Sequence, residues 1–172
     1  MNKKRKAIIA ANEISHVETF NLSGYDQKVL LEGKKKTAPL ILILHGGPGS
    51  AIPFSVGCRG LFPELTEHAI VIYWDQLGCG INNYPIDNHF TIEHFAQMTV
   101  ELIHCLKKQF PEQPINLFGT SWGSVLTAKA AGMVPELLDH VLVYGQVVKE
   151  LAINEEVMET LEKADLPNQV MI

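Results

Sequence analysis

The chain has 172 residues, of which 47% are hydrophobic, and it carries a formal net charge of -5 at pH 7. A chain of this length and apolar content can fill the core of one ordinary domain, which excludes disorder as the default state. The acidic balance provides no basic surface of the kind that nucleic-acid or anionic-membrane binders show, so we expect neither nucleic acid nor membrane as a partner.

The N-terminal segment is basic at residues 3–6, but the apolar run at 7–11 is too short for the core of a signal peptide. No stretch approaches the roughly 20 apolar residues that span a membrane. We therefore expect a solvated, frayed N-terminus and a soluble, cytoplasmic protein. The cysteines Cys58, Cys79 and Cys105 cannot all pair within one chain and have no zinc-ligand spacing, which predicts free thiols in a reducing compartment.

The order of predicted elements indicates an α/β fold. Residues 14–31 carry β-prone stretches interrupted by Asn21, Ser23 and Gly24, which predicts an opening antiparallel hairpin. Strand, loop and helix then alternate, as is typical of a mostly parallel sheet with helices on both faces. Four short runs suit strands buried on both faces, at 40–44, 70–74, 115–118 and 141–144. With the chain stopping soon afterwards, the last of them would be an exposed parallel edge.

Two long helices are predicted between these strands. The first covers residues 92–110, where side chains for a buried stripe recur at helical spacing. They are Ile92, Phe95, Thr99, Leu102, Ile103 and Leu106. The second begins at Ser121 and runs through Ala130 toward Gly132, with small residues that allow close approach to the sheet. A further helix is predicted at 149–164 and would need a partner to cover its apolar residues.

Residues 119–123, Gly-Thr-Ser-Trp-Gly, match the GxSxG pattern of a nucleophile elbow, in which a serine is held between a strand and a helix. The two glycines permit a turn too tight for larger side chains, which leaves the central serine exposed and often strained. The adjoining helix N-terminus offers free N–H groups and a positive dipole end where an oxyanion can develop. We therefore predict that Ser121 is a nucleophile rather than a helix-capping serine.

A glycine-rich loop follows the first parallel strand and consists of His45, Gly46, Gly47, Pro48 and Gly49. Backbone N–H groups at the carboxyl end of a parallel strand can point toward a site above the strand ends. We predict that one oxyanion donor is the N–H of Trp122 and that the other is the N–H of Gly47 or Gly46. A phosphate loop is disfavoured because neither GxxxxGK[ST] nor GxGxxG is present. His45 precedes the nucleophile and is interpreted as a loop-stabilising residue rather than the general base.

A third motif, Trp-Asp-Gln-Leu-Gly-Cys-Gly at 74–80, lies at the end of the next predicted strand. Asp75 is interpreted as the residue of an Asx turn supported by Gly78 and Gly80, rather than as a catalytic acid. Cys79 and Cys105 have no evident activating partner and are interpreted as packing residues.

Together and in this order, the three motifs resemble those of the prolyl iminopeptidase-like branch of the α/β-hydrolases. The resemblance extends from residue 40 to about residue 144, with Leu77 where the family usually has arginine and Ile81-Asn82 in place of a basic-serine pair. It implies an α/β-hydrolase fold, an acyl-enzyme on Ser121 and release of an N-terminal residue, often proline, from peptides. Related members act on amides or esters. It also implies that no metal or organic cofactor is needed.

The resemblance further implies that residues 1–148 are the N-terminal part of the hydrolase core and that residues 149–172 begin a helical cap, so that the fold is incomplete at the C-terminus. The triad order is Ser, then Asp or Glu, then His, and the candidates after Ser121 are Asp139, His140 and Asp165, apart from glutamates. Asp139 and His140 precede a strand, whereas active sites collect at the carboxyl ends.

We therefore expect the acid and the base to lie outside this chain. The expected substrate is a peptide or a small amide or ester, and a second chain that supplies the missing C-terminal half is the candidate protein partner. The alternatives are an esterase or amidase of the same fold, and a non-catalytic fragment or binding module.

Overall fold

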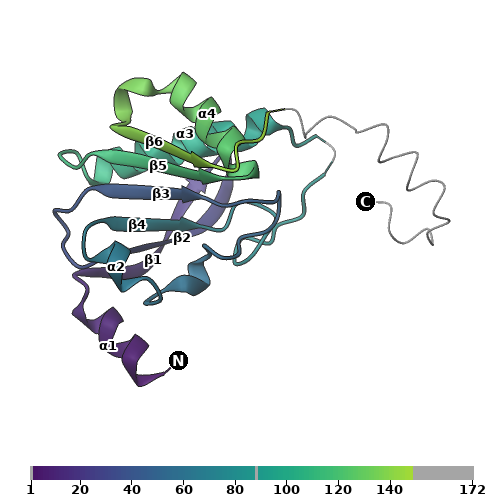
Figure 1. Ribbon diagram of the computed structural model, residues 1–172. Helices are drawn as coiled ribbons and strands as arrows, with labels where there is room; N and C mark the ends of the chain where they lie inside the picture. Colours follow the sequence, from purple (N-terminus) through teal and green to yellow (C-terminus); the bar gives the residue numbers. More distant parts are fainter. Residues whose placement is uncertain (1, 88, 149–172) are drawn as a thin grey trace, which may run out of the picture.

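The computed structural model describes residues 2–87 and 89–148, and in this part of the chain six strands form one sheet in the order β1-β2-β4-β3-β5-β6 (Figure 1). The strands are β1 (Ile14–Leu22), β2 (Tyr25–Gly33), β3 (Leu40–Leu44), β4 (Ile70–Trp74), β5 (Ile115–Thr120) and β6 (His140–Tyr144). The helices are α1 (Lys3–Ala11), η1 (Val56–Cys58), α2 (Pro63–Thr66), α3 (Ile92–Gln109), α4 (Trp122–Met133) and η2 (Pro135–Leu137). The predicted helix at 149–164 and the predicted cap at 149–172 lie outside the described residues.

The sheet is mixed, as predicted. β1 pairs antiparallel with β2, and β2 pairs antiparallel with β4, whereas β3, β4, β5 and β6 run parallel to one another. The hairpin turn falls at Ser23 and Gly24, both of which have positive φ. β3 and β4 have the predicted bounds and are almost completely buried, since their side chains pack into apolar clusters on both faces of the sheet.

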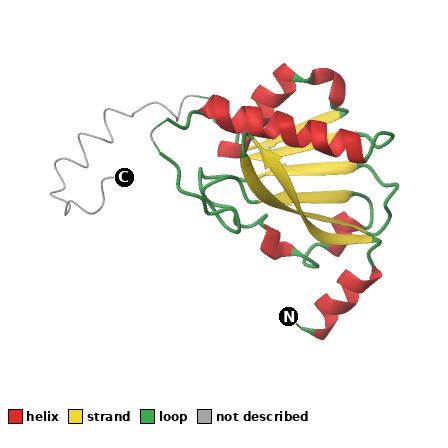
Figure 2. Ribbon diagram, turned by 180° about the vertical axis from the view of Figure 1, so that it is seen from behind, coloured by secondary structure: helices red, strands yellow, loops and turns green. Residues whose placement is uncertain are grey.

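The two long helices cover one face of the sheet (Figure 2). The predicted stripe of α3 is buried from Phe95 to Leu106, and it packs in the same apolar cluster as Leu42 of β3, Trp74 of β4 and Leu126 of α4. This packing confirms the helical period as the signal for the buried face.

The opposite face is covered by η1, α2 and the loops beside them. Tyr73 of β4 is buried there and stacks on Phe62, while Phe54 packs against both Phe62 and Phe118. Helices therefore lie on both faces, although α2 has only 4 residues.

The prediction that 141–144 is buried on both faces is wrong. Every residue of β6 is exposed, including Leu142 at 64% and Tyr144 at 73%. β6 pairs only with β5 in the described part of the chain, so its other edge carries unpaired backbone groups, as expected for an edge strand.

The prediction of a frayed N-terminus is also wrong, because α1 is capped and anchored. The side chain of Asn2 accepts a hydrogen bond of 2.9 Å from the backbone N–H of Arg5. The guanidinium of Arg5 donates to the carbonyl oxygens of Gly57 and Arg59. None of the described helices is long and apolar enough to cross a membrane.

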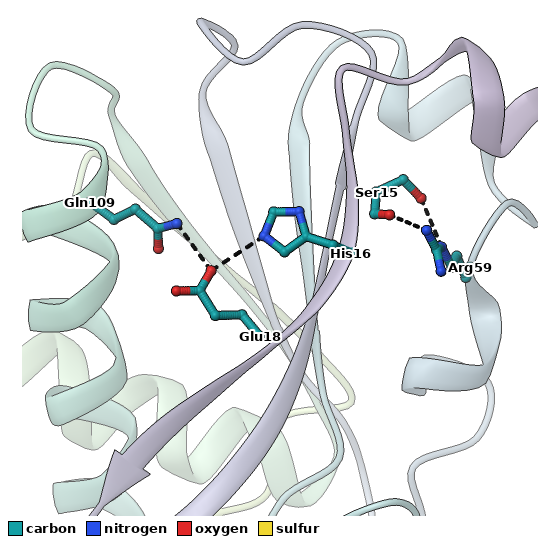
Figure 3. Close-up of polar contacts among 5 residues, drawn as sticks. All are labelled: Ser15, His16, Glu18, Arg59 and Gln109. Atoms are coloured by element: carbon teal, nitrogen blue, oxygen red, sulfur yellow. Dashed lines mark hydrogen bonds and ion pairs between the residues drawn. The ribbon is translucent and has the colours of Figure 1, made fainter.

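Polar contacts fasten β1 on two sides (Figure 3). The carboxylate of Glu18 accepts a hydrogen bond of 3.1 Å from Gln109, the last residue of α3, and lies 3.3 Å from the ring of His16. Arg59 donates to the hydroxyl of Ser15 at 2.9 Å and also to its carbonyl. The outer hairpin is thereby joined to α3 and to the loop that follows η1.

Candidate active site

Three loops meet at one edge of the sheet because they follow the neighbouring parallel strands β3, β4 and β5. They are the glycine-rich loop at 45–49, the loop at 75–82 and the turn at Ser121. The carboxyl ends of adjacent parallel strands are where α/β proteins place their binding sites.

Ser121 occupies a sharp turn between the end of β5 and the start of α4. It is exposed, with φ 51 and ψ -121, and it is the N-cap residue of α4 rather than its first helical residue. Ser121 and Ser23 are the non-glycine residues with positive φ in the described part of the chain. The backbone of a residue with a β-carbon is strained in this conformation. Such a strained turn is what the GxSxG pattern predicts.

The two glycines of the pattern are required by contact distances. A β-carbon added to Gly119 would lie 2.1 Å from Oγ1 of Thr127, and one added to Gly123 would lie 1.9 Å from the carbonyl oxygen of Leu44. α4 therefore starts so close to β3 and β5 that no side chain fits at either position.

Backbone and hydroxyl contacts hold the turn against the end of β6. The N–H of Ser121 donates to the carbonyl of Tyr144 at 2.9 Å, and Oγ of Ser124 donates to the carbonyl of Ser121 at 2.6 Å. Ser124 also accepts a hydrogen bond of 3.0 Å from the N–H of Val147. Sequence analysis missed Ser124, whose only signal is its position one helical turn after Ser121.

The glycine-rich loop lies beside Ser121. A β-carbon added to Gly46 would be 3.4 Å from Cβ of Ser121 and 3.9 Å from its Oγ. Gly47 has φ 121 and Gly49 has φ 83, backbone conformations that residues with a β-carbon rarely adopt. The structure thus brings together the two segments from which the oxyanion donors are predicted.

His45 is completely buried, and its ring forms hydrogen bonds with the glycine-rich loop and with the loop at 75–82. Its Nε2 lies 2.9 Å from the backbone N–H of Gln76 and must accept, while its Nδ1 lies 2.8 Å from the carbonyl oxygen of Gly46 and must donate. The ring is therefore neutral, with its proton on Nδ1. Burial lowers the pKa of His45 below 6.5 and reinforces this state.

Asp75 joins two loops instead of closing a simple Asx turn. Its Oδ1 accepts from the N–H of Val56 at 2.8 Å, and its Oδ2 accepts from the N–H of Ile81 at 3.0 Å. A β-carbon on Gly80 would lie 2.0 Å from Oδ2 of Asp75, which explains the glycine at that position. Asp75 is 3% exposed, and both oxygens of its carboxylate accept hydrogen bonds from backbone N–H groups of these loops.

Of the three positions that depart from the prolyl iminopeptidase pattern, Leu77 and Asn82 are buried, whereas the side chain of Ile81 is exposed. Leu77 is 2% exposed and belongs to the main apolar cluster. The side chain of Asn82 accepts from the N–H of Lys28 at 2.7 Å and donates to the carbonyl of Lys28 at 2.9 Å, so it ties the loop to β2.

The three cysteines are free. Cys79 is buried, and burial raises the pKa of its thiol to about 11. Burial also raises the pKa of Cys105. Neither thiol is therefore ionised near neutral pH, in keeping with a packing role.

Asp139 and His140 pair with each other at 2.6 Å, far from Ser121. His140 is in register with Asn116 at the start of β5, whereas Tyr144 is in register with Thr120 at its end. At about 3.3 Å per residue, the pair lies roughly 13 Å from the turn along the strand. Asp165 lies outside the described residues. Within 2–87 and 89–148, no hydrogen bond joins Oγ of Ser121 to a histidine or carboxylate, and no group of three or more His, Cys, Asp and Glu residues could hold a metal.

Comparison with known proteins gives similarity over most of the chain. A family model described as "alpha/beta hydrolase fold" matches residues 39–166. The probable aminopeptidase YbaC of Bacillus subtilis is 31% identical over 150 residues, which cover 86% of this chain and 45% of that protein. A proline iminopeptidase of Lactiplantibacillus plantarum is 36% identical over 106 residues, which cover 60% of this chain and 35% of that enzyme.

Among solved structures, the 2-hydroxy-6-oxo-6-phenylhexa-2,4-dienoate hydrolase of Rhodococcus sp. strain RHA1 superposes with a TM-score of 0.62 and 26% identity, covering 77% of this chain and 47% of the enzyme. A membrane phospholipase A described as a bacterial virulence factor superposes with a TM-score of 0.68 at 18% identity, covering 94% of this chain and 48% of its own, which shows a shared fold. The chain spans less than half the length of each of these relatives.

Proposed function

This chain belongs to the α/β hydrolase fold family, and from that premise we propose that it carries the nucleophile of a serine hydrolase of the proline iminopeptidase type. The observation that carries the proposal is the exposed Ser121, at φ 51 between β5 and α4, with Gly46 against it. Relatives named as an aminopeptidase and as proline iminopeptidases support the N-terminal end of a peptide as substrate.

In the proposed reaction, Oγ of Ser121 attacks the carbonyl carbon of the N-terminal residue. The C–N bond breaks, the remaining peptide leaves as an amine, and water then hydrolyses the acyl-enzyme. A general base must accept the proton of Ser121 and deliver it to the leaving amine.

Two backbone N–H groups would bind the oxyanion. Trp122 is the first residue of α4, so its N–H has no acceptor within the helix. The carbonyl of Gly46 is held by the ring of His45, and in a planar trans peptide the N–H of the next residue points the opposite way. This favours Gly47 over Gly46 as the second donor.

The acid and the base of the triad would come from residues other than those described. We propose that a C-terminal half of the fold supplies them, and that residues 1–148 are the N-terminal part of the core while residues 149–172 begin the cap. Three free cysteines support a reducing, cytoplasmic location.

The test is labelling of the purified chain with a fluorophosphonate, which phosphonylates activated serines. We expect a single modified residue, Ser121, and complete loss of label in Ser121→Ala. Ser23→Ala is the matched control, because Ser23 is also exposed and has φ 50 but lies in the β1–β2 turn. A folded wild-type chain that takes no label, alone or mixed with a C-terminal half, would contradict the proposal.

Substrate class is tested separately, on unlabelled protein from a preparation that has been shown to react with the fluorophosphonate. Hydrolysis of prolyl and other aminoacyl naphthylamides in preference to p-nitrophenyl esters is expected for an iminopeptidase. The reverse preference would favour the esterase alternative, and labelling without turnover of either substrate would indicate a different acyl group.

A further inference from the structure

Gln76, the second residue after β4, connects the two segments that the proposed reaction uses to bind the oxyanion. Its Oε1 accepts a hydrogen bond of 2.9 Å from the indole Nε1 of Trp122, and its Nε2 lies 3.3 Å from the carbonyl oxygen of His45. We propose that Gln76 is a positioning residue for the oxyanion site. This inference rests on the proposed function and assigns Gln76 no contact with substrate.

The chemistry of the partners determines the orientation of the Gln76 amide. An indole N–H can only donate, so the atom facing Trp122 must be the carbonyl oxygen of the amide. A backbone carbonyl can only accept, so the atom facing His45 must be the amide nitrogen. Both ends of the side chain are therefore used, and a flipped amide would leave two buried groups unpaired.

A second path leads from the backbone of Gln76 to the glycine loop. The N–H of Gln76 donates to Nε2 of His45, and Nδ1 of the same ring donates to the carbonyl of Gly46. The ring thus transmits the position of Gln76 to the peptide between Gly46 and Gly47, which contains the favoured donor N–H. Side chain and backbone of one residue hold both sides of the site.

Burial makes these contacts effective. Gln76 is 2% exposed, Trp122 is 5% exposed and His45 is fully buried, so water does not compete for their polar atoms. An oxyanion site works only when its donors lie about 3 Å from one point, and small displacements reduce the rate. Without the Gln76 side chain, the indole of Trp122 and the carbonyl of His45 lose their partner and are free to shift.

The chain contains a matched control in Gln27. Its side chain is also fully buried, and its Oε1 accepts a hydrogen bond of 2.9 Å from a second indole, that of Trp74. Its other polar contact is the sulfur of Met98 at 3.4 Å. Gln27 therefore reproduces a buried glutamine-tryptophan pair without touching either oxyanion segment.

The experiment compares Gln76→Met with Gln27→Met by the rate of fluorophosphonate labelling and by the 31P chemical shift of the phosphonyl group on Ser121. We expect Gln76→Met to slow labelling by about tenfold or more, since loss of one whole donor costs about 10² to 10³. Its 31P resonance should also move, because the phosphonyl oxygen occupies the oxyanion site. Gln27→Met should label within about twofold of wild type, with an unmoved resonance, as expected for a change outside the site.

Trp122→Phe keeps the test decisive if Gln76→Met does not fold, because it removes the indole N–H, together with part of the ring, and leaves the contact of Gln76 with His45. We expect slower labelling and a shifted resonance in this variant as well. Wild-type rates and an unmoved resonance in the folded variants would overturn the role of Gln76 while leaving the proposed function intact. A wild-type chain that cannot be labelled would overturn the proposed function first, and this role with it.

Discussion

The carbonyl oxygen of Leu44, at the end of β3, lies 1.9 Å from the position that the β-carbon would take if Gly123 were alanine. The start of α4 is therefore in backbone contact with β3, and Gly123 determines how close Ser121 comes to the glycine-rich loop.

Gly123→Ala should destabilise the fold by roughly 3 kcal/mol or more, because backbone atoms that cannot rotate away must shift. Gly132→Ala is the control within the same helix, since no heavy atom lies within 4 Å of the added carbon. Alanine there should stabilise the protein by about 0.5 to 1 kcal/mol. Urea denaturation followed by far-UV circular dichroism measures both, and equal effects of the two substitutions would contradict this packing.

Ser121→Gly should raise the free energy of unfolding by about 1 kcal/mol relative to Ser121→Ala, because glycine adopts positive φ without the clash of a β-carbon. Both variants lack the hydroxyl, so their difference isolates the backbone strain at φ 51. If the two variants unfold at the same urea concentration with the same slope, the turn is not strained.

The stability of the protein should fall in mild acid because of His45. Its pKa is lowered by burial in the folded state, whereas in the unfolded chain it is near 6.5. Below pH 6.5 the unfolded state therefore binds a proton that the folded state does not, and stability is lost progressively until the lower folded pKa is reached. The slope contributed by one such group is at most about 1.4 kcal/mol per pH unit.

Urea denaturation at pH 7, 6 and 5 tests this expectation against His45→Asn, which cannot take up the proton. We expect wild type to lose more stability than the variant over this range. Parallel losses in the two proteins would show that His45 is not the group responsible.

The thiol of Cys79 should be unreactive in the folded chain, since it is 5% exposed and its pKa is about 11. At pH 8 we expect a disulfide reagent to modify Cys105 first, because Cys105 is only partly buried while Cys58 and Cys79 are buried. Cys105→Ser should remove the faster phase, and full reactivity of two thiols should return in urea. A fast phase that persists in folded Cys105→Ser would mean that a buried thiol is accessible.

The sequence by itself determined those features that depend on neighbours along the chain. β-branched runs without alternation indicated the central strands β3 and β4, and a helical period indicated the buried stripe of α3, because a strand or helix turns successive side chains by a fixed angle. The glycines at 119 and 123 indicated the turn at Ser121, since only glycine fits where strand and helix backbones touch.

The tertiary structure alone decided the contacts between residues far apart in the sequence. Gln76 and Trp122 are separated by 46 positions, and Arg5 and Arg59 by 54, so no local pattern could reveal that each pair meets. The exposure of β6 likewise depends on what lies beside it and not on its own apolar residues. A hydrogen bond or a buried face requires a partner in space, and periodicity along the chain specifies which face needs one without specifying which residue provides it.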